Sequence, residues 1–270
     1  MSEAAAESTP PPELRGGDLV RRHKLVTRLW HWTNVVTVTI MLMSGLMIFN
    51  AHPKLYWGHY GANAVEHPDP AWLDLSHFNH GRPFPGWITI PSTYSLADAR
   101  LWHFAFAWIL GLAILGYLLW SLFSGHIKRD LAPRAAELAP SHLWHDIKEH
   151  AALRFPTGAA ALQYNILQKL AYGGVLFVLL PGVILTGMTM SPGLDAALPF
   201  LVDVFGGRQS ARSIHFLCAF GLVGFFFIHI AMVVLAGPIN EVRSMITGWY
   251  RLPRERAVPV QTAGEVGDAV

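Results

Sequence analysis

Four histidines stand inside stretches that are otherwise too apolar for a soluble protein surface. Two of them, His215 and His229, lie within residues 213–240, which contain no Asp, Glu, Lys or Arg. In a helix, this 14-residue spacing places both rings on one face within about 40°, roughly 21 Å apart along the axis. Imidazoles at membrane depth are costly and tend to be functional. The spacing therefore indicates one axial ligand for each of two stacked haems, one near each membrane surface.

Three more charge-free runs cover residues 29–53, 101–127 and 170–194. Each is longer than the ~20 residues that a membrane-spanning helix requires. Hydrophobic residues make up 52% of the chain and charged residues 14%, which is typical of a membrane protein. The single cysteine, Cys218, leaves no C-x-x-C-H motif for covalent haem attachment. We predict an all-α integral membrane protein, a four-transmembrane-helix bundle that holds two stacked b haems by coordination alone.

The same pattern sets the expected boundaries. The first 20 residues are rich in Ala, Pro, Glu and Ser and are expected to form a disordered tail. The membrane domain should cover 21–250, followed by a C-terminal tail, 251–270. The expected spans are about 29–50, 101–124, 168–190 and 212–236, with long connections at 51–100 and 125–166.

Lys and Arg are distributed unequally between the two sides. Residues 1–28, the connection up to Lys169 and the tail from residue 241 together carry fifteen, whereas the other two connections carry five. Such an excess marks the cytoplasmic side. We therefore expect a multi-pass protein of the bacterial inner membrane with both termini and the connection 125–166 in the cytoplasm. The net charge of +2 gives no indication of a nucleic-acid partner.

Depth in the membrane pairs the four histidines. His31 opens a span that enters from the cytoplasm, and His229 lies near the same surface; His103 and His215 lie near the outer surface. Two bis-histidine sites follow, and six-coordinate iron of this kind suits electron transfer. A single histidine in a membrane helix is more often hydrogen-bonded or part of a proton relay. The arrangement in two depth-matched pairs favours haem ligation.

An arginine stands three residues before a histidine at the start of three spans, in T-R-L-W-H-W, A-R-L-W-H-F and A-R-S-I-H-F. Arg28, Arg100 and Arg212 therefore share a helix face with the histidines and could pair with haem propionates. Their alternative role is that of interfacial residues whose charge reaches the headgroups. Gly45 follows His31 by 14 residues and would admit a flat porphyrin; ordinary helix packing is its alternative role.

The four-span plan, the R-L-W-H-W opening and the H-x13-H fourth span resemble the bacterial cytochrome b561 family over roughly residues 20–250. This family includes the b-type cytochrome subunits of nickel–iron hydrogenase, formate dehydrogenase and thiosulfate reductase. The resemblance implies that the iron ligands are His31, His103, His215 and His229. The long connection 51–100 is most similar to the thiosulfate-reductase-type branch, whose members often accompany periplasmic molybdopterin oxidoreductases.

A polar cluster precedes the third span in Q-Y-N-I-L-Q-K-L, residues 163–170, which is similar to the family's Y-N-x-x-Q-K segment beside its quinone site. A quinone that exchanges electrons also exchanges protons, so its oxygens need polar neighbours. The candidate quinone residues are Tyr164, Asn165, Gln168 and Lys169. The alternative is an ordinary helix start in the headgroup region.

The expected function is electron transfer between the quinone pool and a periplasmic redox protein or oxidoreductase subunit that docks on the connection 51–100. Two haem b groups are the expected cofactors and quinone is the expected exchangeable substrate. The chain is expected to be an electron-transfer subunit of an oxidoreductase complex, with quinone oxidoreduction as its own chemistry. A stand-alone transmembrane haem reductase is one alternative. A non-haem transporter is another, although the span centres lack the buried acidic residues that coupling commonly uses. Association into a homodimer stays open.

Overall fold

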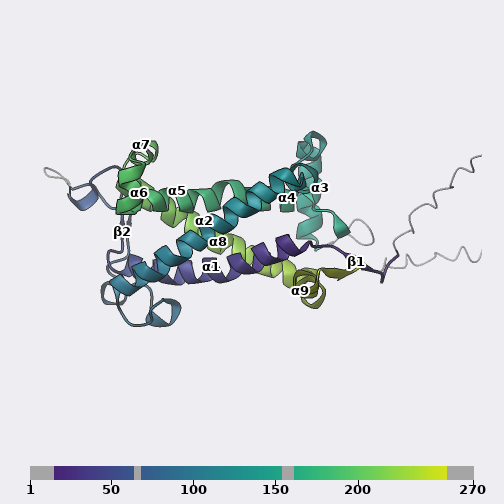
Figure 1. Cartoon of the computed structure of the whole chain (residues 1–270), viewed down its shortest axis with the longest axis horizontal. Helices are drawn as coiled ribbons and strands as arrows, with labels where there is room; N and C mark the ends of the chain where they lie inside the picture. Colours follow the sequence, from purple (N-terminus) through teal and green to yellow (C-terminus); the bar gives the residue numbers. More distant parts are fainter. Residues whose placement is uncertain (1–14, 64–67, 154–160, 254–270) are drawn as a thin grey trace, which may run out of the picture.

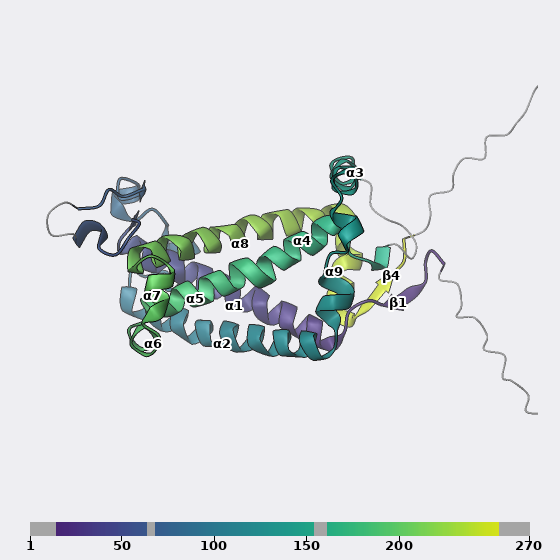
Figure 2. The same cartoon turned by 90° about the horizontal axis from the view of Figure 1, so that it is seen from above.

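The computed structural model describes residues 15–63, 68–153 and 161–253. Four helices are long and apolar enough to cross a membrane: Leu25–Asn50, Leu96–Phe123, Ile166–Met190 and Arg208–Ala236. They run side by side along the long axis of the molecule (Figures 1 and 2). The prediction of an all-α membrane protein with a four-helix bundle is confirmed. The predicted tail 1–20 lies mostly outside the described residues, and its last two residues belong to a short strand instead.

The first two spans are the helices α1, Leu25–Asn50, and α2, Leu96–Phe123, and the fourth is α8, Arg208–Ala236. Each begins four or five residues before its predicted start, because a helix continues into the headgroup zone as long as its backbone groups are paired. Ser95 illustrates this at α2: its side chain accepts the N–H of Asp98 and caps the helix before the apolar run begins.

The third span changes its winding halfway. It consists of α4, Ile166–Gly174, then a π-helical segment η7, Val175–Leu179, and then α5, Leu180–Met190. Pro181 lies two residues after the end of the π segment and has no N–H to donate, so local rewinding of the helix is expected there. Beyond it, α5 packs tightly on α8: a Cβ at Gly182 would lie 2.8 Å from the Cys218 sulfur.

The closest backbone contacts divide the bundle into two helix pairs, α1 with α2 and α5 with α8. A buried apolar cluster from α2 and the third span, including Leu110, Ile114, Leu176 and Leu180, joins the pairs. Most other apolar side chains on the long helices remain exposed, as expected for surfaces that face lipid.

One end of the bundle, here called the loop end, carries the connection between α1 and α2. The described part of this connection is ordered: it contains the strands β2, Lys54–Leu55, and β3, Leu73–Asp74, and the 3₁₀ turns η1, Gly61–Asn63, η2, Asn79–Gly81, and η3, Gly86–Ile88. The carbonyl of Gly58 accepts the N–H groups of Gln209 and Ser210 at the start of α8. The Trp72 indole also donates to Ser213 at 2.9 Å. The connection therefore caps α8 and holds its first turn. The short helices α6, Pro192–Ala197, and α7, Phe200–Val204, lie at the same end (Figure 1).

The opposite end, here called the termini end, joins the two ends of the chain. Strand β1, Leu19–Arg21, pairs antiparallel with β4, Trp249–Arg251. Arg22 forms an ion pair with Glu241 at 3.1 Å and lies over the Tyr250 ring. Glu241 belongs to α9, Pro238–Thr247, and this helix and α3, Pro140–Ala151, cross the end of the bundle (Figure 2). The π segment η4, Ile127–Leu131, and the turn η5, Ala135–Leu138, lead from α2 to α3.

Candidate functional site

The structure brings the four predicted histidines together as two pairs. At the loop end, His103 of α2 faces His215 of α8, with ring centroids 6.1 Å apart and ring planes at 59°. At the termini end, His31 of α1 faces His229 of α8, with centroids 6.3 Å apart and planes at 58°. These are the pairs that the depth argument predicts. Each pair crosses from the α1–α2 helix pair to α8.

The spacing of the rings suits a shared metal ion. A metal–imidazole bond is about 2.0 Å long and the ring centroid lies about 1.1 Å behind the nitrogen, so two imidazoles on opposite sides of one ion have centroids about 6.2 Å apart. The two observed separations, 6.1 and 6.3 Å, agree with this value. The ring planes of both pairs are tilted, which disfavours a direct hydrogen bond between the two rings, and in the loop-end pair both Nδ1 atoms have other partners.

In the loop-end pair, the Nδ1 atoms of both histidines lie within hydrogen-bond distance of main-chain or hydroxyl oxygens. Nδ1 of His103 lies 3.1 Å from the Met41 carbonyl, which can only accept, so this nitrogen carries a proton. It also lies 3.1 Å from the hydroxyl of Ser44. Nδ1 of His215 lies 3.0 Å from the hydroxyl of Thr186.

The hydroxyl protons are used elsewhere. Ser44 donates to the carbonyl of Ile40 at 2.8 Å, and Thr186 donates to the carbonyl of Gly182 at 2.5 Å. A hydroxyl has one proton, so each oxygen must accept from the imidazole. Both rings therefore carry their proton on Nδ1, which leaves Nε2 with a free electron pair for a metal.

Glycines give the loop-end rings their space. A Cβ at Gly45 would lie 3.4 Å from Cε1 of His103, and one at Gly187 would lie 3.5 Å from Cε1 of His215. Gly45 thus lies against the His103 ring, a neighbour that the sequence analysis did not name. Ser44, Thr186 and Gly187 were missed altogether. The repeated hydroxyl–glycine dipeptide, Ser44–Gly45 in the first span and Thr186–Gly187 in the third, was the available signal.

The termini-end pair has a different environment. Nδ1 of His31 is buried and has no hydrogen-bond partner among the described residues. The ring of Phe225 stacks on His229, with centroids 5.7 Å apart and planes at 13°. Aromatic packing, rather than hydroxyl groups, therefore surrounds this pair.

The three arginines lie near the histidines but already have protein neighbours. Arg28 donates to the carbonyl of Ile246, and Arg212 donates to the carbonyl of His52 at 2.6 Å. Arg100 is exposed and lies over the Phe104 ring at 5.5 Å. A guanidinium has five N–H groups, so each of these contacts leaves donors that could reach a carboxylate.

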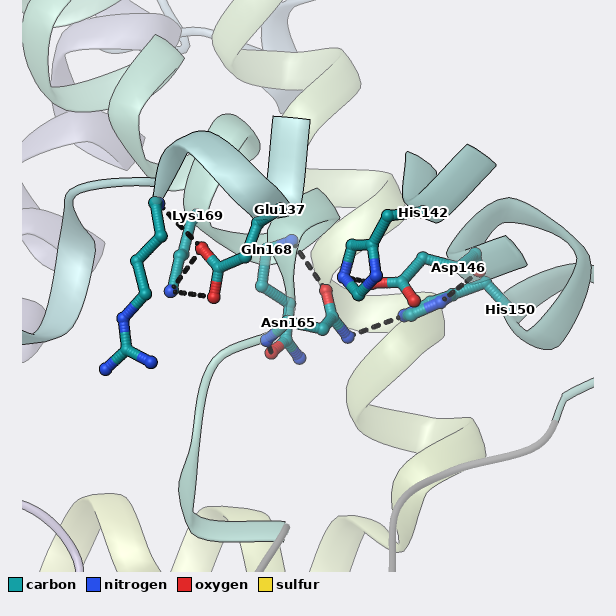
Figure 3. Close-up of polar contacts among 8 residues, drawn as sticks. Glu137, His142, Asp146, His150, Asn165, Gln168 and Lys169 are labelled. Atoms are coloured by element: carbon teal, nitrogen blue, oxygen red, sulfur yellow. Dashed lines mark hydrogen bonds and ion pairs between the residues drawn. The ribbon is translucent and has the colours of Figure 1, made fainter. Parts of the chain in front are cut away.

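The polar cluster at the start of the third span is largely occupied by structural contacts (Figure 3). Asn165 caps α4 by accepting the N–H of Gln168 at 2.9 Å, and Gln168 accepts the N–H of Asn165 in return at 3.3 Å. The Asn165 amide also reaches Nε2 of His150 on α3 at 3.0 Å. Lys169 is buried and binds both oxygens of Glu137 at 2.8 Å.

Tyr164 and Lys169 line a cavity of about 330 Å³ at the termini end. The other lining residues come from the segment before α1 and the first turn of α1, from residues 126–137 and from the approach to α4. They include His23, Thr27, His126, Asp130 and Gln163. His126 lies 2.6 Å from the Asp130 carboxylate, so an acid–base pair forms part of the wall. A cavity of this size accommodates the ring of a small organic molecule.

Burial controls the protonation of several groups around this cavity. Burial lowers the pKa of His23 to about 4, with nearby Arg22 adding to the effect, so this imidazole is neutral at physiological pH. Burial also raises the pKa of the Tyr164 phenol. For Asp130, burial alone would raise the pKa, but hydrogen bonds from Arg129 and His126 outweigh it and keep the pKa below its usual value.

Four apolar spans with two facing histidine pairs are typical of a membrane protein that carries a metal-centred cofactor. The chain matches the model of the prokaryotic cytochrome b561 family over residues 22–248, and it belongs to this family. It is therefore a multi-pass b-type cytochrome of electron transport, and its cofactor is haem b.

Three relatives are similar to this chain along most of their length. A provisionally named protein-methionine-sulfoxide reductase subunit, YedZ1 of Azospira oryzae, is 29% identical over 215 residues, which cover 77% of this chain and 87% of the relative. A probable Ni/Fe-hydrogenase B-type cytochrome subunit of Azotobacter vinelandii is 22% identical over 250 residues, 85% of this chain and 87% of the relative. The cytochrome YdhU of Escherichia coli, also provisionally named, is 27% identical over 244 residues, 87% of this chain and 76% of the relative.

Proposed function

We propose that the chain is a di-haem cytochrome b that passes electrons through the membrane between the quinone pool and an oxidoreductase partner. The observation that carries this proposal is the presence of two facing histidine pairs whose centroid separations both suit a shared metal ion. His103 and His215 would hold one haem, and His31 and His229 the other. When bound, haem iron supplies reversible one-electron chemistry, and two histidine ligands leave it no open position for oxygen or substrate.

The protein residues around the irons have separate tasks. The histidines would hold the two groups with their Nε2 atoms, and the lipid-facing side chains would exclude water. Arg28, Arg100 and Arg212 would supply remaining donors to propionates near the two surfaces. Gly45 would keep the space beside the His103 ring open.

Orientation follows from the distribution of Lys and Arg. The termini end would face the cytoplasm and the loop end the periplasm of a bacterial inner membrane. The partner would then dock at the loop end, where Tyr60, Phe78 and Trp87 are exposed. Relatives named as subunits of hydrogenase and of sulfoxide reductase support an oxidoreductase as that partner. The long connection between α1 and α2 resembles the thiosulfate-reductase-type branch, so a molybdopterin enzyme is the partner class we propose.

Quinone would bind in the cavity at the termini end. Tyr164 and Lys169 line this cavity, together with the His126–Asp130 pair, so hydrogen-bonding and proton-accepting groups surround one space. Asn165 and Gln168 would contribute indirectly, by fixing the start of α4 beside it. Replacement of Tyr164 by Phe removes one hydroxyl and should slow haem reduction by a quinol analogue without changing the haem spectra. Tyr60→Phe at the loop end is the matched control, and equal rates in both variants would place the quinone elsewhere.

Haem content tests the central proposal. Purified wild-type protein should contain two b haems per chain by pyridine haemochrome analysis. Replacement of His215 by Ala should remove the loop-end haem and replacement of His229 the termini-end haem, while His145→Ala on the exposed face of α3 should remove none. One haem per chain in folded wild-type protein would refute the di-haem assignment.

A further inference from the structure

The two histidine pairs differ in the hydrogen-bond partners of their Nδ1 atoms. Both rings of the loop-end pair have Nδ1 next to a fully buried hydroxyl, Ser44 for His103 and Thr186 for His215. At the termini end, Nδ1 of His31 has no hydrogen-bond partner among the described residues. The difference is built into the two helix pairs, because each hydroxyl comes from the helix packed most closely against its histidine.

The direction of these hydrogen bonds decides their effect. Each hydroxyl has already donated its proton to a carbonyl of its own helix, so it accepts from the imidazole. An imidazole that donates its Nδ1–H to an oxygen becomes a stronger donor through Nε2. A ligand that donates electrons more strongly stabilises ferric iron more than ferrous iron. Hydrogen bonds to the side chain that ligates the iron therefore change the reduction potential of a haem.

We propose that Ser44 and Thr186 are positioning residues that fix the ligating nitrogen of the loop-end histidines and lower the reduction potential of the haem they hold. The proposal rests on the di-haem function proposed above. Gly45 and Gly187, each next to its hydroxyl in the chain, bring the helix backbone close enough for the contact. The termini-end haem lacks this effect on at least one of its ligands.

Substitution of the two hydroxyls, followed by spectroelectrochemical measurement of both haem potentials, tests this proposal. Ser44→Ala and Thr186→Val remove the hydroxyls with little change in volume. Each should raise the potential of the loop-end haem, with the smaller rise in Ser44→Ala because the Met41 carbonyl still accepts the His103 Nδ1–H. The double variant should raise the potential further, and the termini-end haem should keep its potential. The loop-end signal is identified as the one absent from His215→Ala. Haem content is measured in every variant, so that a shift is read only from protein with two haems.

Conservative and control variants distinguish a specific effect of the hydroxyls on the haem potential from a general effect of substitution on the structure. Ser44→Thr and Thr186→Ser retain a hydroxyl and should retain the wild-type potential. Thr189→Val is the control, since Thr189 is equally buried on α5 but donates to the Thr186 carbonyl and not to a histidine. If Thr186→Val loses haem, the shift is read from Ser44→Ala. Unchanged potentials in the double variant, equal shifts of both haems, or an equal shift in Thr189→Val would overturn the proposal. A wild type with one haem would instead refute the di-haem function.

Discussion

Replacement of Asn165 by Ala should loosen the first turn of α4 and leave the haems untouched. The Asn165 side chain accepts the N–H of Gln168 at 2.9 Å and donates to His150 at 3.0 Å, so it both caps the helix and ties it to α3 (Figure 3). Alanine can do neither. The four histidines proposed to hold haem lie on other helices.

The magnitude follows from the two lost contacts. Loss of an N-cap side chain costs about 0.5–2 kcal/mol, and loss of one further hydrogen bond about 0.5–1.5 kcal/mol. The sum, about 1–3.5 kcal/mol, corresponds to a roughly 5- to 300-fold larger open population, because about 1.4 kcal/mol is a factor of ten. The amide hydrogens of Gln168 and Lys169, which bond to Asn165 in the closed turn, should exchange faster by this factor.

Hydrogen–deuterium exchange of a peptide that covers the start of α4 measures this effect in detergent-solubilised protein. Ser95→Ala, which removes the N-cap of α2 at the loop end, is the matched control and should leave exchange at α4 unchanged. Unaltered exchange at Gln168 and Lys169 would refute the reasoning. A fall in quinol-driven haem reduction larger than that of Tyr164→Phe would show that Asn165 contacts the quinone itself.

Three further outcomes are expected. Trp87→Ala should weaken partner docking by about 2 kcal/mol, or roughly 30-fold, because Trp87 is 80% exposed at the loop end. Surface plasmon resonance measures the affinity. Trp144 is exposed at the termini end, and Trp144→Ala should leave the affinity unchanged. The pKa of buried His23 is lowered from 6.5 to about 4, so the unfolded protein takes up a proton more readily than the folded protein. The free energy of unfolding should therefore be highest above pH 6.5 and decrease by up to about 3 kcal/mol as the pH falls to 4. Thermal melting of His23→Gln should show a shallower loss over that range, and an identical pH profile would contradict this. Arg22→Met should cost about 3 kcal/mol locally by leaving the partly buried Glu241 carboxylate unpaired; unchanged hydrogen exchange at residues 249–251 would argue against that role.

The helices and the histidine pairing were predictable because they depend on long runs and regular spacing. Residues 213–240 contain no charge, and the fourteen-residue spacing of His215 and His229 places both rings on one face. The helix starts were less predictable, since caps such as Ser95 decide them locally. Asn165 and Gln168 were predicted to bind quinone, with an ordinary helix start as the alternative, and the capping box supports the alternative for both residues.

Other features have no strong local signal in the sequence. The sheet of β1 and β4 joins three-residue strands from opposite ends of the chain, and neither segment is long enough to show strand periodicity. The contacts of Ser44 and Thr186 with histidines depend on the rotation of neighbouring helices about their axes. Periodicity identifies the apolar face of a helix, but hydrophobic surface all round a membrane helix removes most of that information.

The chain topology explains why one helix carries two of the histidines and two other helices carry one each. His31, His103 and His215 are the seventh or eighth residues of α1, α2 and α8, so each lies about two turns from the start of its helix. Because α1 and α2 are antiparallel neighbours, this position falls at opposite ends of the bundle in the two helices. A single helix that packs against both α1 and α2 can supply a histidine opposite His103 and another opposite His31 only if the two lie on the same face. Its second histidine must therefore follow the first by a near-whole number of turns. His229 satisfies that condition, and α8 therefore places one histidine opposite His103 at the loop end and one opposite His31 at the termini end.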